Sequence, residues 1–342
     1  MKVWGIRLAF AAVFASGVVG RSSAEPVEDF YRGKTVNVAI GYDVGGGFDL
    51  YARLLVRHMG MHIPGNPTLL PQNMPGAGSL KATNYLYSVA PRDGTAFGAI
   101  GRSIPLAPLL DTANAGFDAL AFNWLGSASK DVLVAVSWHT SPVKTLEDAT
   151  HTELIVGSDS AASETTQIPL LLNATLGTKF KIITGYSIPQ IALGMERGEL
   201  AGQIGWSLDS MLTAHSDWVR DHKVNILLQT GFLPDGRLPG VPLAVDHARS
   251  DADKALLTMV FSMEEMARPY VAPPGLPAER VKALADAFMA TVGDPDYRAD
   301  AARSKLDIQA ASAEEVTSII RKAYAMPPAV IARAKGLLTV QK

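Results

Sequence analysis

The sequence contains no cysteine among its 342 residues. This absence excludes disulfide scaffolds, thiol nucleophiles, zinc–cysteine sites and lipid attachment to an N-terminal cysteine. An excess of charge of one sign is also lacking, because 31 Lys and Arg residues nearly balance 33 Asp and Glu residues. A nucleic-acid-binding protein needs a basic face to neutralise phosphates, so we expect no nucleic-acid partner. Hydrophobic residues make up 48% of the chain, which is enough for a large core and excludes wholesale disorder.

The N-terminus has the layout of a secretory signal peptide. Lys2 and Arg7 precede an uncharged, mostly apolar stretch over residues 8–20, and Ser22 and Ala24 place small residues before Glu25. The apolar stretch is shorter than the ~20 residues that span a bilayer as a helix. The sequence therefore predicts a signal peptide over residues 1–24, cleavage after Ala24 and a mature protein in the periplasm.

Short β-rich runs alternate with helical patterns through most of the mature chain. Such alternation is typical of α/β domains with parallel sheets and crossover helices. We expect strands at residues 35–40, 69–73, 95–100, 131–138, 154–157, 179–184, 200–205 and 224–230. We expect helices at residues 49–59, 79–89, 165–176, 188–197, 208–219 and 277–293, and one that Ser312 caps.

A glycine-rich loop over residues 41–47 joins the first expected strand to the first helix. Gly45, Gly46 and Gly47 leave backbone N–H groups uncovered by side chains. The N-terminus of the following helix adds unpaired donors and a partial positive charge, so the loop is a candidate anion site. A merely tight turn is the alternative interpretation. We expect Asp49 to be the N-cap of the helix.

A second loop between a strand and a helix covers residues 157–163. It offers hydroxyl groups and backbone N–H groups near the start of the helix. Its alternative interpretation is simple helix capping. Two such loops in successive α/β units indicate a cleft with one anion-binding edge on each side, because uncharged donors orient a carboxylate without a buried cation.

Motifs of catalysis and metal binding are absent from the sequence. It has no G-x-S-x-G elbow, Walker A loop, H-E-x-x-H motif or EF-hand loop. Ser207, Asp209 and His215 have the residue types of a catalytic triad, but types alone are weak evidence. His58 and His62 lie four residues apart without a nearby carboxylate or cysteine in the sequence. We therefore expect no catalytic residue, no metal and no cofactor.

Seven segments occur in an order that is typical of one family. They cover residues 41–53, 73–78, 91–95, 157–163, 185–199, 238–242 and 272–277, and include the sequences GYDVGGGFDLYAR, NMPGAG and PRDGT. These segments resemble the periplasmic substrate-binding receptors of tripartite tricarboxylate transporters, the Bug receptors. The resemblance covers nearly all of the chain after the predicted signal peptide.

The resemblance implies a two-lobed, Venus-flytrap fold of the periplasmic-binding-protein type. Each lobe is expected to be a mostly parallel sheet flanked by helices, with a two-strand hinge. The first lobe would combine residues 25–128 with 235–342, and the second would cover residues 129–234. The implied function is capture of a small organic carboxylate by a monomer that delivers it to a membrane permease. A periplasmic sensor for a signalling kinase and an α/β hydrolase are the alternatives.

The family's binding positions, carried over one by one, give candidate ligand-binding residues. In the first lobe they are Tyr42, Gly46, Gly47, Phe48 and Asp49, and in the second they are Ser158, Ser160, Ala161 and Ser163, together with Tyr186 and Asp209. Phe48 stands where the family usually has Ser or Thr. This change favours an aromatic or larger apolar acid. Trp206 fits the cleft and the core equally well.

Overall fold

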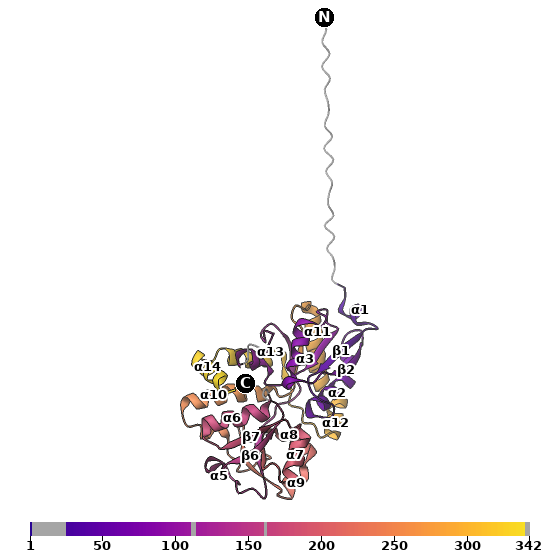
Figure 1. The fold of residues 1–342 in the computed structure, drawn as a ribbon. Coiled ribbons are helices and arrows are strands. Elements are labelled where there is room, and N and C mark those ends of the chain that lie inside the picture. Colours follow the sequence, from indigo (N-terminus) through magenta and orange to yellow (C-terminus); the bar gives the residue numbers. More distant parts are fainter. Residues whose placement is uncertain (2–24, 111–113, 161–162, 339–342) are drawn as a thin grey trace.

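Two β-sheets flanked by helices form two lobes, which Figure 1 shows one above the other. The computed structural model describes residues 1, 25–110, 114–160 and 163–338. Residues 2–24 of the predicted signal peptide and Ala161 lie outside the described residues. None of the described helices is both long and apolar enough to cross a bilayer.

The first lobe is built on a six-stranded sheet with the order β11-β4-β10-β3-β1-β2. Its strands are β1 (Thr35–Ile40), β2 (Thr68–Asn73), β3 (Ala96–Ala99), β4 (Asn123–Ser127), β10 (Pro269–Ala272) and β11 (Ala311–Ser312). The helices of this part of the chain are α1 (Val27–Tyr31), α2 (Gly47–Met59), α3 (Leu80–Ser88), α4 (Ala107–Leu110), α11 (Ala278–Gly293), α12 (Pro295–Arg303) and α13 (Ala313–Tyr324). β1 is parallel to β2 and β3, whereas β10 is antiparallel to β3 and β4.

The second lobe is built on a five-stranded sheet with the order β7-β6-β8-β5-β9. Its strands are β5 (Leu133–Trp138), β6 (Leu154–Ser158), β7 (Phe180–Thr184), β8 (Gly202–Ser207) and β9 (Val224–Gln229). Its helices are α5 (Leu146–His151), α6 (Glu164–Leu176), α7 (Ile188–Glu196), α8 (Leu208–Ala214) and α9 (Ser216–Arg220). β6 is parallel to β7 and β8, and β5 is antiparallel to β8 and β9.

The two-lobed α/β fold is confirmed, but the prediction of mostly parallel sheets is wrong in detail, because both sheets are mixed. Strands β5 and β9 pair antiparallel beside the parallel β6–β8 unit. The predicted helix over residues 208–219 is interrupted at His215, which separates α8 from α9. Strands β4, β10 and β11 were not predicted. β11 has only two residues, and β10 begins with Pro269, which lacks the N–H that a strand interior requires.

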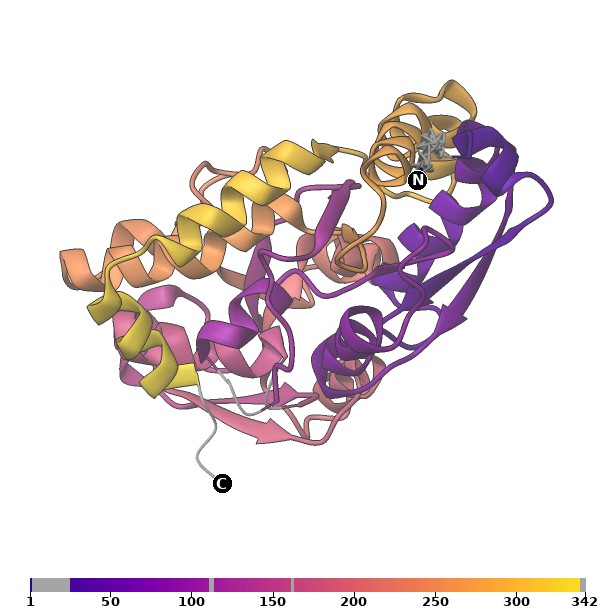
Figure 2. The ribbon, with the colours of Figure 1, turned by 90° about the horizontal axis from the view of Figure 1, so that it is seen from above.

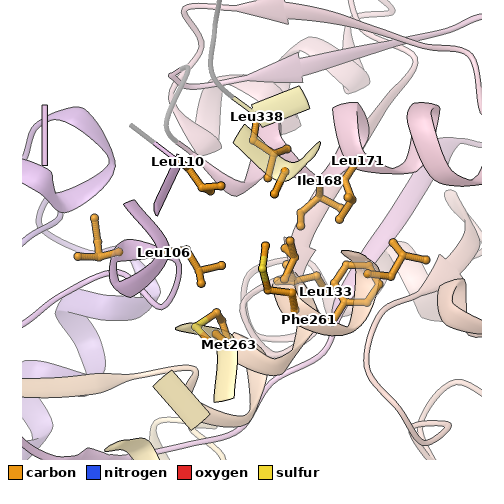
Figure 3. Packing of buried hydrophobic residues seen from close by; sticks show 14 of the residues in the cluster. Leu106, Leu110, Leu133, Ile168, Leu171, Phe261, Met263 and Leu338 are labelled. Carbon is orange, nitrogen blue, oxygen red and sulfur yellow. The ribbon is translucent and has the colours of Figure 1, made fainter. Parts of the chain in front are cut away.

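A hydrophobic cluster joins the two lobes along one side. Helices α10 (Asp251–Phe261) and α14 (Pro328–Leu338) both contact α6 of the second lobe. Figure 2 shows the C-terminal helices against the α10 segment. Figure 3 shows the cluster itself, to which both lobes and the C-terminal segment contribute Leu106, Leu110, Leu133, Ile168, Leu171, Phe261, Met263 and Leu338. Because interiors are close-packed, this side is the stiff side of the molecule.

A β-bulge at Gly205 changes the direction of β8 near its C-terminal end. Trp206 pairs with Val134 and Ile204 pairs with Ala135, so Gly205 is the extra residue between them. Its φ of +73° lies in the left-handed region that favours glycine. Bulges of this kind bend a strand and re-aim the side chains that follow.

We expect Gly205→Ala to destabilise the protein by about 1–2 kcal/mol or more, because a left-handed alanine is strained. Its Cβ would also lie 2.7 Å from the backbone oxygen of Glu164. Urea unfolding of the mature protein measures the change in unfolding free energy. Gly293→Ala is the control, since no atom lies within 4 Å of that Cβ position and no positive φ is involved. Equal stabilities for the two variants would contradict a structural role for the bulge.

Candidate ligand-binding cleft

A cleft of about 650 Å³ lies between the lobes. Its walls combine the first predicted loop with the starts of α7 and α8 from the other lobe. The first lobe contributes Tyr42, Asp43, Val44, Gly45, Gly46, Gly47, Leu50, Tyr51 and Leu306, and the second contributes Asp159, Ser187, Ile188, Pro189, Trp206, Asp209, Ser210, Thr213, Ala214 and His215. A volume of this size is typical of sites that enclose a small molecule.

A deeper compartment of about 180 Å³ adjoins the cleft. The two spaces share lining residues from both lobes, among them Tyr42, Gly47 and Trp206. The compartment also has residues of its own, which are Phe48, Gly78, Arg102, Ser103, Ser163, Glu164, Thr165, Gln203, Gly205, Ser207 and Arg268. The cleft is therefore joined to a smaller space whose lining includes the buried side chains of Arg102, Gln203 and Arg268.

The first predicted loop is held in shape by Asp49. The helix begins at Gly47 with Gly46 as its N-cap, so the prediction of Asp49 as the N-cap is wrong. The Asp49 carboxylate accepts hydrogen bonds from Gly45 N at 2.9 Å, Arg53 Nε at 2.9 Å and Asn73 Nδ2 at 2.8 Å. Burial opposes ionisation, but these hydrogen bonds outweigh it and lower the pKa of Asp49. Asp49 thus stabilises the glycine loop through these hydrogen bonds. It does not line the cleft or the deeper compartment.

Besides α8, three helices begin at the walls of this space. The first intrahelical bonds run from Leu50 N to Gly46 O in α2, from Gln167 N to Ser163 O in α6 and from Ile191 N to Ser187 O in α7. In α2 the amides of Gly47, Phe48 and Asp49 precede the first such bond and have no intrahelical acceptor. In α6 the Thr166 amide already donates to Ser163 O at 3.1 Å, and in α7 Pro189 has no N–H and the Gln190 amide is capped by the Ser187 side chain, so these two helices offer fewer free amides. Helix dipoles place partial positive charge at the same ends. The arrangement favours an anion although no lysine lines either space.

The second predicted loop uses most of its hydroxyl groups internally. Ser158 is fully buried, and its hydroxyl contacts those of Thr165 and Thr166. The carbonyl of Ser160 accepts hydrogen bonds from Ser163 Oγ and Thr166 Oγ1, both at 2.8 Å. Among these predicted residues, the structure places Ser163 at the deeper compartment, whereas Ser158 and Ser160 line neither space.

The two remaining predicted residues, Tyr186 and Asp209, differ in their surroundings. Tyr186 packs against a hydrophobic cluster of the second lobe, and its backbone N–H donates to Ser158 O at 3.0 Å. Asp209 lines the wide cleft and accepts a hydrogen bond from Arg237 Nη1 at 2.7 Å. Burial and the nearby Asp131 raise the pKa of Asp209 despite Arg237.

An aromatic pair forms one wall of the floor. The rings of Tyr42 and Phe48 stack with their centroids 4.1 Å apart and an interplanar angle of 10°. The guanidinium carbon of Arg268 lies 4.6 Å from the centroid of the Phe48 ring, which is a cation–π distance. The predicted residues Tyr42 and Phe48 therefore meet at the floor, with an arginine that the sequence did not single out.

Asp131 lies between two buried arginines where the chain passes from β4 to β5. Its Oδ2 is 3.2 Å from Arg102 Nη2 and 3.3 Å from Arg268 Nη2, and it also accepts a hydrogen bond from Ser207. Burial would raise the pKa of Asp131, but the two arginines outweigh it and hold the pKa below its usual value. The second connection, after β9, is tied to the first lobe by Thr230, whose Oγ1 donates to Glu264 Oε2 at 2.5 Å.

The residues of the possible catalytic triad and the two histidines of the possible metal site each interact with other side chains. Ser207 donates to Asp131, Asp209 accepts from Arg237, and His215 lies against Trp206 and Trp218. The three residues therefore do not form a hydrogen-bonded triad in the structure. His58 and His62 each face an aspartate of the α12 segment, with Nε2 to Oδ2 distances of 2.8 Å and 2.9 Å.

Comparison with known proteins agrees with this geometry. No family model matches the chain. It is 24% identical over 310 residues to a UPF0065 protein in the gbd 5′ region of Cupriavidus necator, with 88% of each chain covered. The solved structure of the periplasmic binding protein BugD has a TM-score of 0.68 at 17% identity and covers 90% of this chain and 99% of that one. Rpa4515 from R. palustris with adipate also has a TM-score of 0.68, at 15% identity, with 89% and 98% covered. These likenesses confirm the two-lobed fold and the resemblance to Bug receptors.

We expect Asp131→Asn to cost about 3–5 kcal/mol of unfolding free energy, because it removes the buried negative charge that Arg102 and Arg268 share. The folded pKa of Asp131 is lowered, so its contribution is present above the unfolded value of about 3.9 and is lost as the pH falls through the folded value. Urea unfolding at pH 7 measures the loss of unfolding free energy. The same measurement at acidic pH should show a smaller difference between the variant and the wild-type protein. Asp286→Asn, in the exposed pair with Lys282, is the control and should change stability by under about 0.5 kcal/mol. A similar loss in both variants would contradict the assigned role.

Proposed function

We propose that the protein is an extracytoplasmic receptor that binds a small organic carboxylate between its lobes without converting it. The observation that carries this proposal is the meeting of helix starts from both lobes at one cleft, which draws an anion to the place where closure occurs. We further propose export with cleavage after Ala24, action as a monomer, and delivery of the ligand to the permease of a tripartite tricarboxylate-type transporter.

The relatives support a receptor over an enzyme. BugD is described as a periplasmic binding protein, and Rpa4515 was solved with adipate. The chain matches these proteins over nearly their full length. A ligand that contacts both lobes stabilises the closed form through its differential affinity for that form. The proposed lobes are residues 25–128 with 235–342, and residues 129–234, with the two connections as the hinge.

Gly46 offers a direct test of the anion site. A Cβ at this position would meet only Asp43 O, at 3.7 Å, and the φ of −76° suits any residue. We therefore expect Gly46→Asp to leave the fold intact and to abolish carboxylate binding by repulsion. Gly46→Asn is the isosteric control and should bind more tightly than Gly46→Asp by at least about tenfold. Thermal shift and calorimetry with mono-, di- and tricarboxylates provide the readout. Equal binding by the two variants would show that the loop has only a structural role.

Gly47 tests closure of the lobes. Its Cβ position lies 2.8 Å from Ser210 Oγ of the other lobe and 3.4 Å from Arg268 Nη2. We expect Gly47→Ala to oppose closure and weaken ligand binding, because the added methyl needs the space of the Ser210 hydroxyl. The second substitution Ser210→Ala removes that hydroxyl and should restore part of the affinity, since Ser210 Cβ is 4.0 Å away. Calorimetry on the single and double variants measures this coupling. If the losses of binding free energy in the two single variants simply add in the double variant, closure at this contact is contradicted.

A further inference from the structure

The floor of the cleft holds a polar group that the fold does not use. Gln203 is fully buried within β8, yet neither its side-chain nitrogen nor its side-chain oxygen has a hydrogen-bond partner among the described residues. It lines the deeper compartment of about 180 Å³ beside Ile188 and Trp206. Buried amides are almost always hydrogen-bonded, and leaving one unpaired is costly. An unpaired side-chain amide in the lining of a cavity indicates a bound partner that both donates and accepts.

The charges around the compartment limit what that partner is. Its lining contains two guanidinium groups, Arg102 and Arg268, and two carboxyl groups, Asp159 and Glu164, and Asp131 lies between the arginines. Arg102 pairs with Asp131, and its Nε lies within ion-pair distance, 3.0 Å, of Glu164 Oε1, although the guanidinium keeps Nη1 without a hydrogen-bond partner among the described residues. Burial, Asp131 and Asp159 raise the pKa of Glu164 against the pull of the arginines. Even with Glu164 uncharged, Asp131 and Asp159 balance Arg102 and Arg268, so a further carboxylate would add net negative charge to the compartment.

The two spaces consequently suit different ends of one ligand. The wide cleft has the helix starts of α2 and α7, which favour a carboxylate. The deeper compartment offers one donor and one acceptor on Gln203, which match the acceptor and donor of a carboxamide. Building on the proposed function, we infer that the ligand is a monocarboxylate with an uncharged carboxamide at its opposite end, which pairs with Gln203 in the deeper compartment, and not a dicarboxylate.

Matched ligand pairs test this inference. Each pair has one chain length and differs only in whether the second end is a carboxylate or its amide: succinate and succinamate, adipate and adipamate, suberate and suberamate. We expect calorimetry on the mature protein to show at least about tenfold tighter binding of the monoamide in the best-fitting pair, since two hydrogen bonds are gained and a repulsion is avoided. Tighter binding of the dicarboxylate overturns the inference and leaves the proposed receptor function standing. Failure of every acid in the panel to bind counts against both.

Variants of Gln203 assign the preference to this side chain. We expect Gln203→Met, which keeps the side-chain size and removes both polar atoms, to lose the monoamide preference while the aliphatic acid hexanoate still binds. Retained hexanoate binding and an unchanged unfolding midpoint show that the variant is folded, and Gln203→Leu gives a second apolar replacement. Gln309→Met, on the exposed surface, is the control and should keep the preference. A monoamide preference that survives both Gln203 variants would mean that only water occupies the compartment, and would overturn the inference.

Discussion

The carboxylate of Asp131 is the constraint on which the cleft depends. It lies in the connection between the two sheets and neutralises guanidinium groups from two distant segments, one after β3 and one before β10. Arginines buried this deeply are tolerated only when they are paired and hydrogen-bonded. The same carboxylate accepts from Ser207, which caps α8. The floor of the cleft, its connection to the hinge and the start of one wall helix are therefore fixed by a single buried group.

The two sides of the molecule have contrasting mechanics. On one side, the hydrophobic cluster of Figure 3 joins α6 to α10, α14 and the segment around Leu106, and close packing leaves it little freedom. On the other side, the lobes meet across the cleft at small groups, with Gly47 against Ser210. Opening of the cleft is easiest where contacts are few and polar, so relative motion of the lobes should pivot about the packed side. The fold thus combines a packed side with a small polar contact at Gly47 and Ser210, as the proposed opening and closing of the lobes requires.

The sequence predicted the parts of the fold that local pattern controls. The run at residues 35–40 is β1 without a residue of error, and the expected helices at 165–176 and 188–197 are α6 and α7 within a residue. The glycine loop does line the cleft, because helix starts follow from local chemistry. The floor was not predicted, since Arg102, Gln203 and Arg268 come from separate segments without a shared motif. A signal was present for Gln203 and for Asp131, the partner of the two arginines: Gln203 lies in an apolar strand sequence, Asp131 directly precedes another, and buried polar groups need partners.

The cleft is arranged so that attraction for an anion comes from the backbone and not from free cations. Asp49, Asp131 and Asp209 each accept from an arginine, which are Arg53, Arg102 and Arg237 respectively. These carboxylates and guanidinium groups largely cancel in pairs, and the field that remains is that of the helix starts. Such a field is fixed in direction, whereas a free lysine would attract any anion that entered. For the proposed ligand, selectivity then rests on which end meets the helix starts and which end meets the uncharged amide of Gln203. A receptor of the proposed kind would distinguish ligands by which of their two ends is charged, as well as by their total charge.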